Sequence, residues 1–402
     1  MRLAIVVPTF PQASETFIAS KVSGLASRGV DVHVVCQESP EATWAALGLD
    51  EALRPRVHVV PSGRSPRQLL ATLAQVGHLV RHGPADAARA TRRARSVGAP
   101  LGAIGADAAL VAIAPDVVHF EFGALAPQRL YLKALLGCRL TVSFRGYDLA
   151  YAGLEDDGFY TRLWAEVDRV HLLGDGLWQR ARHRGAPDDL PRALIPPAID
   201  PSRFAAPPVD NGPIGMPDRP VRLVSVGRLH WTKGYEHALE AVARLRADGA
   251  TLQYRIVGDG PYLDAVSFWR HQLGLDDCVE LCRSATPDEV AAHLGWCDIF
   301  LHAAVSEGFG NAVLEAQAAG RPVVATDADG LIENVDNGVT GYVVPRRDPA
   351  ALHAALNRLV ADADERVRLG AAGPGRVREK FALADHLDAW EAFYQTTMET
   401  RR

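Results

Sequence analysis

The 402-residue sequence lacks several features that would assign it to a particular class of protein. It has no run of roughly 18 apolar residues, so we expect no helix that spans a membrane. Its five cysteines are scattered without a Cys-x-x-Cys pair, so their spacing does not match that of a zinc site. This pattern favours reduced thiols in a cytosolic protein. The formal net charge of −5 disfavours a general nucleic-acid binder, which is usually basic.

Several catalytic signatures are also missing from the sequence. There is no P-loop, no His-Glu-x-x-His, no Gly-x-Ser-x-Gly, and no Gly-x-Gly-x-x-Gly after the first apolar segment. The segment VGDGPYL (257–263) contains Gly-x-Gly but has Leu263 where the third glycine belongs. Acid pairs such as Asp156–Asp157 are expected to be solvated in loops. A dinucleotide dehydrogenase, a zinc protease and a serine hydrolase are therefore unsupported, and no metal or other cofactor is expected.

What the sequence does contain is an alternation of short apolar segments with amphipathic helical ones. The apolar segments are rich in Val, Leu and Ile, as expected of strands buried on both faces of a parallel sheet. The alternation indicates βαβ units and an α/β fold. The predicted strands are 3–10, 30–37, 57–61, 116–123, 140–146 and 169–174, followed by 221–229, 252–258, 279–282, 298–305, 321–326 and 341–345.

A Pro-rich segment separates the two series of strands. Residues 205–220 hold five prolines and two glycines, and we interpret them as an interdomain linker. The predicted parts of the chain are residues 1–205, 206–381 and a C-terminal helix in 382–402. The apolar stripe of that helix consists of Leu387, Trp390, Phe393 and Tyr394. We expect the ligand site in a cleft between the two halves, because ligands bind outside the carboxyl ends of parallel strands.

One segment is strongly basic. Residues 64–95 contain seven arginines against one aspartate, with no lysine or glutamate, and so have a net charge of +6. A basic amphipathic helix would bind an anionic lipid surface or an anionic acceptor. A solvated surface helix is the alternative. Peripheral contact with the inner membrane face is therefore a hypothesis for a protein that is otherwise expected to be cytoplasmic.

Two cations follow the first strand of the second series. The segment VGRLHWTKG (226–234) places Arg228 and Lys233 in a loop that leads to a helix. Cations at the carboxyl end of a strand, beside the free N–H groups of a helix N-terminus, form an anion site. Solvated loop cations are the alternative.

The segment SEGFGNAVLEA (306–316) repeats this arrangement after a later strand. Glu307 lies in the loop, and Glu315 lies one turn into a predicted helix. Each acid has a simpler explanation, because Glu307 is able to cap the helix and Glu315 suits its dipole. Together with the two cations, however, they suit a diphosphate that joins two hydroxylated groups. Cations neutralise a leaving diphosphate, and carboxylates accept hydrogen bonds from sugar hydroxyls.

At these residues the chain closely resembles the retaining GT-B glycosyltransferases of family 4, the glycosyl transferases group 1. The first half looks like the branch that makes exopolysaccharides of the colanic acid type. The motifs that carry the resemblance are Gly227-Arg228-Leu229 with Lys233-Gly234, VGDGP (257–261), the Glu307-x7-Glu315 pair, GRPVVATD (320–327), GVTGYVVP (338–345), PTFPQASETFI (8–18), SFRGYDL (143–149) and PPAIDPSRF (196–204).

This resemblance implies two Rossmann-like domains that face a central cleft, with the C-terminal helix crossing back to the first domain. It implies transfer of a hexose from a nucleotide sugar, a UDP-sugar on family frequency, with retention and without a metal. The acceptor would be a hydroxyl of a glycan, a lipid-linked sugar or a natural product. The implied donor-side residues are Gly227, Arg228 and Lys233 for the diphosphate, Glu315 for the ribose, and Glu307 with the backbone of Phe309, Gly310 and Asn311 for the sugar.

The first half departs from the pattern of many relatives at three places. His119-Phe120-Glu121 replaces His-x-His, so Glu121 is expected to alter donor choice or to weaken the contact with the donor sugar. Arg145 replaces the histidine of a His-Gly-x-Asp motif, and it contacts either an anionic ligand or, for structure only, Asp148. Paired glycines of the entrance loop are replaced as well, and Ser14 there is able to cap the next helix. The candidate residues on the acceptor or donor-sugar side are Ser14, Glu15, Thr16, His119, Glu121, Arg145 and Asp148.

Two other functions fit the same fold. A catalytically inactive binding subunit would usually have lost Arg228, Lys233 or the glutamate pair, and all of these are present. A nucleotide-sugar epimerase or a phosphorylase would use acids and histidines from both halves, for which His119 and Glu121 are available.

Overall fold

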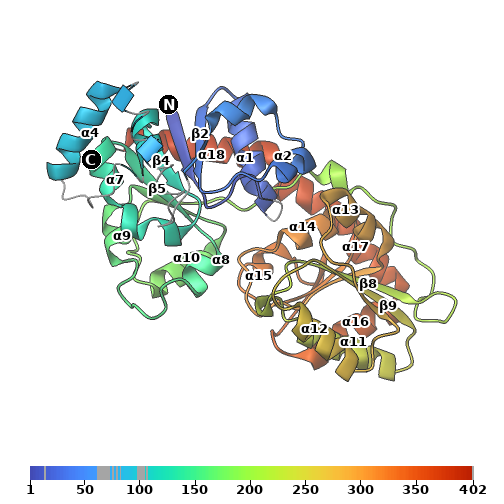
Figure 1. Cartoon of the computed structure of the whole chain (residues 1–402). Coiled ribbons are helices and arrows are strands. Elements are labelled where there is room, and N and C mark those ends of the chain that lie inside the picture. The colour runs from blue at the N-terminus through green and yellow to red at the C-terminus, as the bar shows by residue number, and fades with distance from the viewer. Residues whose placement is uncertain are drawn as a thin grey trace. The chain divides into compact units, whose positions relative to one another are not determined.

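The computed structural model describes residues 1–12, 15–60, 83–96 and 107–400, together with positions 73, 74, 77, 80, 81 and 105. It contains two compact units (Figure 1). Unit 1 comprises Met1–Ile195 and Leu387–Arg402, and unit 2 comprises Pro196–His386.

Each unit is built around one parallel sheet. The strand order is β3-β2-β1-β4-β5-β6-β7 in unit 1 and β10-β9-β8-β11-β12-β13 in unit 2. The strands are β1 (Arg2–Val6), β2 (Asp31–Cys36), β3 (Val57–Val59), β4 (Val117–Phe120), β5 (Arg139–Phe144), β6 (Arg169–Leu172) and β7 (Arg192–Leu194), then β8 (Val221–Val226), β9 (Leu252–Val257), β10 (Val279–Leu281), β11 (Ile299–His302), β12 (Val323–Thr326) and β13 (Gly341–Val344). In both sheets the order reverses beside the first strand, as in doubly wound folds.

The predicted strands are confirmed, each shorter than the apolar segment that indicated it. Strand β7 is an addition that the apolar pattern does not predict. It has three residues, and two of them are exposed, so its sequence resembles that of a loop. Its partner β6 supplies the pairing that makes it a strand.

Helices cover the faces of both sheets. In unit 1 the helical segments are α1 (Thr16–Ser27), α2 (Glu41–Leu47), η2 (Glu51–Arg56), α4 (Pro84–Ser96), α6 (Ala108–Ile113), η3 (Gly123–Leu125), η4 (Pro127–Arg129), α7 (Tyr131–Leu136), α8 (Gly146–Ala150), α9 (Thr161–Glu166) and α10 (Asp175–His183). In unit 2 they are η5 (Pro201–Phe204), η6 (Trp231–Lys233), α11 (Tyr235–Ala247), α12 (Leu263–Gln272), α13 (Pro287–Trp296), α14 (Asn311–Ala318), α15 (Leu331–Asn334), α16 (Pro349–Ala361) and α17 (Ala363–Lys380).

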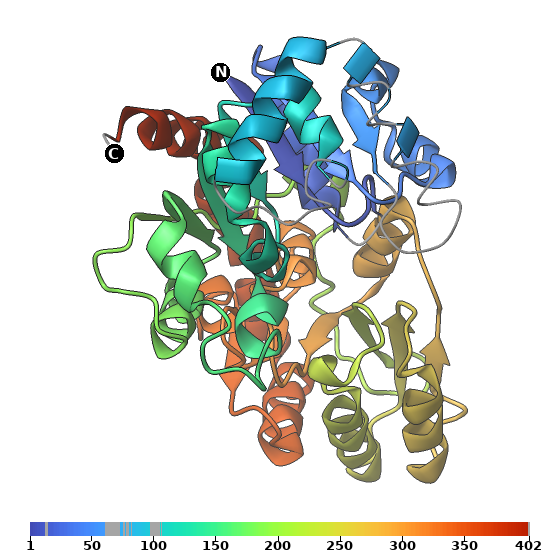
Figure 2. The same cartoon turned by 60° about the vertical axis from the view of Figure 1, so that its left-hand side comes forward.

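Local sequence explains where helix α13 of unit 2 begins and how other helices of the unit pack. The side chain of Thr286 accepts a hydrogen bond from the N–H of Glu289, whose carboxylate accepts one from the N–H of Thr286, which is the capping box that starts α13. Helices α11 and α16 lie side by side (Figure 2). Their buried residues, such as Leu239 and Leu356, join the hydrophobic core of the sheet.

The C-terminal helix α18 (Leu383–Glu399) buries the predicted apolar stripe. Its first residues belong to unit 2, and from Leu387 onward it is part of unit 1, where it lies beside α1 (Figure 1). The ring of Trp390 contacts the imidazoles of His119 and His171, with ring centroids 5.3 and 4.4 Å apart. A Cβ atom on Gly24 of α1 would lie 2.5 Å from the Leu387 side chain, so glycine is what allows this close approach.

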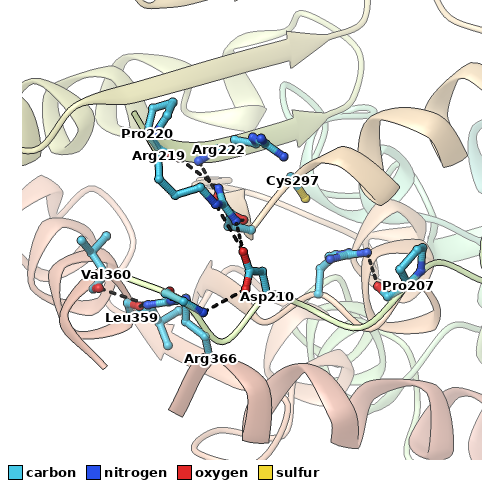
Figure 3. Close-up of polar contacts among 12 residues, drawn as sticks. Pro207, Asp210, Arg219, Pro220, Arg222, Cys297, Leu359, Val360 and Arg366 are labelled. Atoms are coloured by element: carbon cyan, nitrogen blue, oxygen red, sulfur yellow. Dashed lines mark hydrogen bonds and ion pairs between the residues drawn. The ribbon is translucent and has the colours of Figure 1, made fainter. Parts of the chain in front are cut away.

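The Pro-rich segment 205–220 belongs to unit 2 rather than linking the units. Figure 3 shows Arg219, which belongs to this segment, and Arg366 of α17, which approaches the segment near Asp210. The guanidinium of Arg219 donates to Asp298 at 2.8 Å and to Asp210 at 3.3 Å, while that of Arg366 donates to the carbonyl oxygen of Gly212 at 2.6 Å. Proline and glycine composition resembles that of a linker, but these long-range contacts fasten the segment to unit 2.

The division between the units falls between Ile195 and Pro196, ahead of the predicted boundary after residue 205. Ile199 forms a β-bridge with Ala382, and η5 packs against α13 and α14. The residues after Pro196 are therefore held by unit 2.

Candidate functional site

The carboxyl ends of β8 and β11 bring the two predicted halves of the donor site together. These strands are neighbours at the point where the strand order of unit 2 reverses, which is where doubly wound sheets bind ligands. The carbonyl oxygen of Thr232, in the loop after β8, accepts hydrogen bonds from the N–H groups of Val305 and Ser306 at 2.8 and 3.2 Å. The loop after β8 is thereby tied to the loop after β11.

Glycines allow the backbones at this edge to approach one another. Gly234 has φ +60°, and a Cβ atom there would lie 2.2 Å from the carbonyl oxygen of Ala303. In the VGDGP segment, a Cβ atom on Gly258 would lie 2.0 Å from the carbonyl oxygen of Gly227. The glycines of this segment therefore serve close packing of the chain after β9 against the loop after β8.

Lys233 and Glu307 form an ion pair across the two loops. The Glu307 carboxylate also contacts Nε2 of His302 at 3.0 Å and accepts a hydrogen bond from the N–H of Gly308 at 3.1 Å. Burial alone would raise the pKa of Glu307, but Lys233 and His302 outweigh it and hold the pKa well below its ordinary value. Burial lowers the pKa of His302, so this imidazole is neutral at pH 7. Glu307 is therefore an ionised acceptor held in one position.

Arg228 precedes this ion pair in the same loop. Its side chain is exposed, and no hydrogen bond or ion pair of its guanidinium is found in the part of the chain that the structure describes. An exposed cation at the edge of the site is thus available to an anionic ligand. The neighbouring Gly227 contributes its carbonyl oxygen to a hydrogen bond from the Tyr235 hydroxyl at 2.8 Å, which fixes the backbone from which Arg228 projects.

A glycine turn leads from Glu307 into helix α14. Gly310 has φ +88° and stands immediately before the helix, which begins at Asn311 as predicted. The amide group of Asn334 donates to the carbonyl oxygens of Phe309 and Gly310, both at 2.9 Å, from a fully buried position. The carbonyl oxygens of the turn are therefore occupied. The N–H groups of Phe309, Gly310 and Asn311 donate no hydrogen bond within the described ranges, and they stand at the positive end of α14.

The side chain of Phe309 does not take part in this site. It is 3% exposed and packs edge-on against Phe381, with ring centroids 5.7 Å apart. The donor-sugar contact that the resemblance implies for Phe309 would therefore be made through its backbone.

Glu315 follows one turn later on α14. Burial raises the pKa of its carboxyl to about 7, with a small opposing effect of Arg203. No hydrogen bond or ion pair of this carboxyl is found among the described residues. The simpler explanation for Glu315 was a charged group that suits the helix dipole, but burial disfavours its ionised form. Its carboxyl is half-buried and accepts no hydrogen bond from the described residues.

Sequence reasoning missed the residues that hold the glycine turn from behind. Asp329 accepts hydrogen bonds from the Ser306 hydroxyl at 3.2 Å and from the N–H of Glu307 at 3.4 Å. Arg346 lies 3.5 Å from Asp329 and donates to the carbonyl oxygen of Val305 at 3.3 Å. Asp329 has φ +39°, a strained position for a residue with a side chain, but the sequence carries no local signal for it.

Two candidate residues of unit 1, Glu121 and Arg145, belong to a buried ionic network. The carboxylate of Glu121 is fully buried, pairs with Lys21 of α1, and accepts a hydrogen bond from the Arg145 guanidinium at 2.8 Å. The Lys21 ammonium lies over the Trp390 ring, 3.8 Å from its centroid, and Arg145 lies over Phe17 at 4.1 Å. Glu121 is thus the counter-ion of two cations, and the expected contact with a donor sugar has no support from its position.

His119 is enclosed beside this network. Its ring nitrogens contact the hydroxyls of Thr141 at 2.8 Å and Ser143 at 2.9 Å. The Ser143 hydroxyl also contacts Nδ1 of His171. Burial lowers the pKa of His119 well below its usual value, and Lys21 adds to this effect. A neutral, fully buried imidazole of this kind supports the sheet rather than contacting a ligand.

Asp148 positions the backbone of Arg145 instead of pairing with its side chain. The Asp148 carboxylate accepts hydrogen bonds from the N–H groups of Arg145 at 2.8 Å and Ala124 at 3.0 Å. Burial raises the pKa of Asp148 to about 6 and lowers that of Arg145 to about 10. The ion pair between these two side chains was one of the two alternatives for Arg145, and in the structure Arg145 pairs with Glu121 instead.

The structure describes two of the three candidate residues in the entrance loop, Glu15 and Thr16. Ser14 lies outside the described residues. Glu15 stands immediately before α1 and makes no capping hydrogen bond through its side chain, and Thr16 is the first residue of the helix. Glu15 is close enough to Arg145 to raise the pKa of that guanidinium, which opposes the larger effect of burial. Glu15 thus belongs to the charged surroundings of Arg145.

Comparison with known proteins identifies the family. Residues 210–376 match the family model described as "Glycosyl transferases group 1". The GDP-mannose-dependent alpha-(1-6)-phosphatidylinositol monomannoside mannosyltransferase of Mycolicibacterium smegmatis is 34% identical over 276 residues, which are 64% of this chain and 71% of that protein. The chain is a group 1 glycosyltransferase.

Other relatives of this glycosyltransferase match over most of its length. A protein of Salmonella typhimurium named as the colanic acid biosynthesis glycosyltransferase WcaL is 28% identical over 372 residues, 89% of this chain and 90% of WcaL. Among solved structures, Anabaena HepE in complex with UDP has a TM-score of 0.71 at 14% identity and covers 98% of this chain and 100% of its own. This likeness confirms the GT-B fold, with its two Rossmann-like sheets, for the glycosyltransferase.

The described helices of the glycosyltransferase give no membrane-spanning candidate, since none of them combines sufficient length with sufficient apolar character.

Proposed function

We propose that this glycosyltransferase moves a hexose from a nucleoside diphosphate sugar to an acceptor hydroxyl with retention of configuration and without a metal. The observation that carries the proposal is the Lys233–Glu307 ion pair at the switch point of the unit 2 sheet, with Arg228 exposed beside it. Fixed cations at this point stabilise the negative charge that builds on a departing diphosphate.

The roles of the remaining donor residues follow from what each one offers. The free N–H groups of Phe309, Gly310 and Asn311 stand at the N-terminus of α14 and suit a phosphate or sugar oxygen. Glu307 is ionised and rigid, so it accepts hydrogen bonds from donor-sugar hydroxyls. Glu315 accepts hydrogen bonds from the ribose hydroxyls, because its carboxyl has no such bond within the protein.

In the transfer step, the acceptor oxygen attacks the anomeric carbon from the face that the diphosphate leaves. The bond from the anomeric carbon to the diphosphate breaks while the new glycosidic bond forms, and a phosphate oxygen takes the proton of the acceptor hydroxyl. Arg228 and Lys233 neutralise the departing diphosphate. Retention follows from attack on the same face.

For the donor we propose a UDP-sugar, supported by the UDP complex of HepE, although the mycobacterial relative is named for GDP-mannose. For the acceptor we propose a glycan hydroxyl in polysaccharide biosynthesis, supported by the naming of WcaL for colanic acid. A lipid-linked or natural-product hydroxyl is the other form of acceptor that the sequence predicts.

We place the protein in the cytoplasm, with contact to an anionic membrane through residues 64–95. Within this segment, helix α4 exposes Arg89, Arg92, Arg93 and Arg95. Sedimentation with vesicles that contain anionic lipid tests the contact, because a surface bound by charge is released by salt.

The function is tested by thermal-shift screening against UDP-, GDP-, ADP- and TDP-sugars, followed by NMR of the anomeric configuration of the product. A UDP-sugar is expected to raise the Tm most, and the product is expected to keep the donor's configuration. An inverted product would contradict retention. Formation of a new sugar nucleotide without any acceptor would indicate an epimerase, and absence of both hydrolysis and transfer would indicate an inactive binding subunit.

A further inference from the structure

Unit 1 carries an exposed aromatic side chain that the donor chemistry does not use. All nine tyrosines lie in the described residues, and Tyr147 is 63% exposed while the other eight are buried or half-buried. Its ring lies beside that of Tyr151, with centroids 5.9 Å apart and an angle of 44° between the planes. We call Tyr147 and Tyr151 the tyrosine platform.

The tyrosine platform stands at the ligand-binding edge of the unit 1 sheet. Helix α8, which contains Tyr147, begins two residues after β5 ends at Phe144. This is the carboxyl edge of a doubly wound sheet, where ligands bind. The same edge carries Glu121 and Arg145, so the platform adjoins the ionic network of unit 1.

The backbone under the platform is held firmly. The N–H groups of Tyr151 and Ala152 donate to the carbonyl oxygen of Tyr147 at 2.9 and 3.1 Å. The Tyr160 hydroxyl donates to the carbonyl oxygen of Asp148 at 2.8 Å, and Arg184 donates to that of Ala152 at 2.8 Å. An exposed ring on a fixed backbone loses little conformational freedom on binding a ligand.

We propose that the tyrosine platform stacks against a neutral pyranose ring of the acceptor. The C–H groups on one face of a pyranose form an apolar surface that packs on a tyrosine ring, while the hydroxyls at the rim stay hydrated. The charge next to the platform does not select an anion, because Arg145 is already opposed by Glu121, Glu15 and Asp148. The assignment to the acceptor rests on the proposed glycosyl transfer, but binding to the platform requires no donor.

Saturation-transfer NMR with methyl glycosides tests this proposal. The probes are the methyl pyranosides of glucose, mannose and galactose, with methyl glucuronide as the anionic probe. We expect at least one neutral pyranoside to bind the full-length wild type, with saturation strongest on its ring C–H protons. Tyr147→Ala is expected to weaken that binding roughly three- to tenfold, the value of one aromatic stacking contact. Tyr147→Trp is expected to retain it.

The matched control is Phe268→Ala. Phe268 is 58% exposed on α12 of unit 2 and lies beside another aromatic ring, that of Trp269, with centroids 6.5 Å apart. Its removal is expected to leave pyranoside binding unchanged. Equal binding by wild type and Tyr147→Ala would overturn the proposal, as would binding of the glucuronide alone or of no pyranoside.

A separate measurement keeps this proposal distinct from the proposed function. UDP is expected to raise the Tm of wild type and Tyr147→Ala equally, because the donor residues lie in unit 2. Failure of UDP to stabilise either protein would count against the donor assignment. Pyranoside binding tests the tyrosine platform independently of the donor.

Discussion

Lys233 and Glu307 are separated by 74 residues in the chain and form an ion pair between the loops that follow β8 and β11. The pair exists because these two strands are neighbours in the sheet. Lys233 and His302 outweigh the effect of burial and hold the pKa of Glu307 well below its ordinary value. In the proposed function, this contact connects the cation that holds the diphosphate to the acceptor for the donor sugar.

Replacing Lys233 by alanine is expected to lower kcat/KM for transfer by about 10²-fold or more, because the fixed positive charge at the diphosphate is lost. Release of the nucleoside diphosphate provides the rate, and a circular dichroism spectrum establishes that the fold is intact. Lys380→Ala removes an exposed lysine of α17 and is the matched control, with no expected change. Turnover close to that of wild type in Lys233→Ala would show that the site is assigned wrongly.

Glu315 is expected to make stability depend on pH. Its pKa is raised from an ordinary 4.5 to about 7, so between these values the folded protein binds more protons than the unfolded chain. Its contribution to stability is therefore complete below about pH 4.5 and declines as the pH rises toward 7. Glu315→Gln stays neutral, so we expect it to have a higher Tm than wild type near pH 8 and a similar Tm near pH 4.5.

The same variant separates stability from binding. If Glu315 accepts hydrogen bonds from the ribose, Glu315→Gln binds UDP at least about tenfold more weakly at pH 8, since a hydrogen bond to a charged group is worth about 1.5–3 kcal/mol. Titration calorimetry measures this change. A variant that is more stable and binds UDP as tightly as wild type would remove Glu315 from the donor site.

Replacing Asn334 by leucine is expected to destabilise the protein by about 2–3 kcal/mol and to abolish the UDP-induced rise in Tm. The substitution removes the hydrogen bonds from Asn334 to the carbonyl oxygens of Phe309 and Gly310. Both oxygens then stay buried without that donor. Urea unfolding gives the stability. Asn337→Leu, in the next loop, is a control that loses one hydrogen bond to Val343 without touching the turn, and it is expected to keep the UDP response.

Substitutions in the ionic network of unit 1 are expected to have non-additive effects on the free energy of unfolding. Glu121→Gln leaves Lys21 and Arg145 buried without their counter-ion and is expected to cost about 3–5 kcal/mol. The double variant Lys21→Met with Glu121→Gln removes one of the stranded charges, so we expect it to be more stable than Glu121→Gln alone. Thermal unfolding of wild type, Lys21→Met, Glu121→Gln and the double variant measures the coupling. A double variant less stable than either single variant would mean that the two side chains are not a charge pair.

Much of the donor half was predictable because its signals are local. Apolar segments of Val, Leu and Ile identify the buried strands, and a glycine before Asn311 marks where α14 begins. The sequence did not predict the pairing of Arg145 with Glu121. The two alternatives for Arg145 were an anionic ligand and Asp148. Lys21 carries no signal at all, because a lysine in an amphipathic helix is usually solvated.

The sequence by itself determined the alternation of strands and helices, the two α/β halves and the residue types available for donor chemistry. The tertiary structure decided which of those residues meet. The strand order reverses beside β8 and so places Lys233 against Glu307. Trp390 of α18 packs on His119 and Lys21, and Lys21 pairs with the buried Glu121. Burial then sets their charge, because the cost of removing an ion from water depends on neighbours that are distant in the chain.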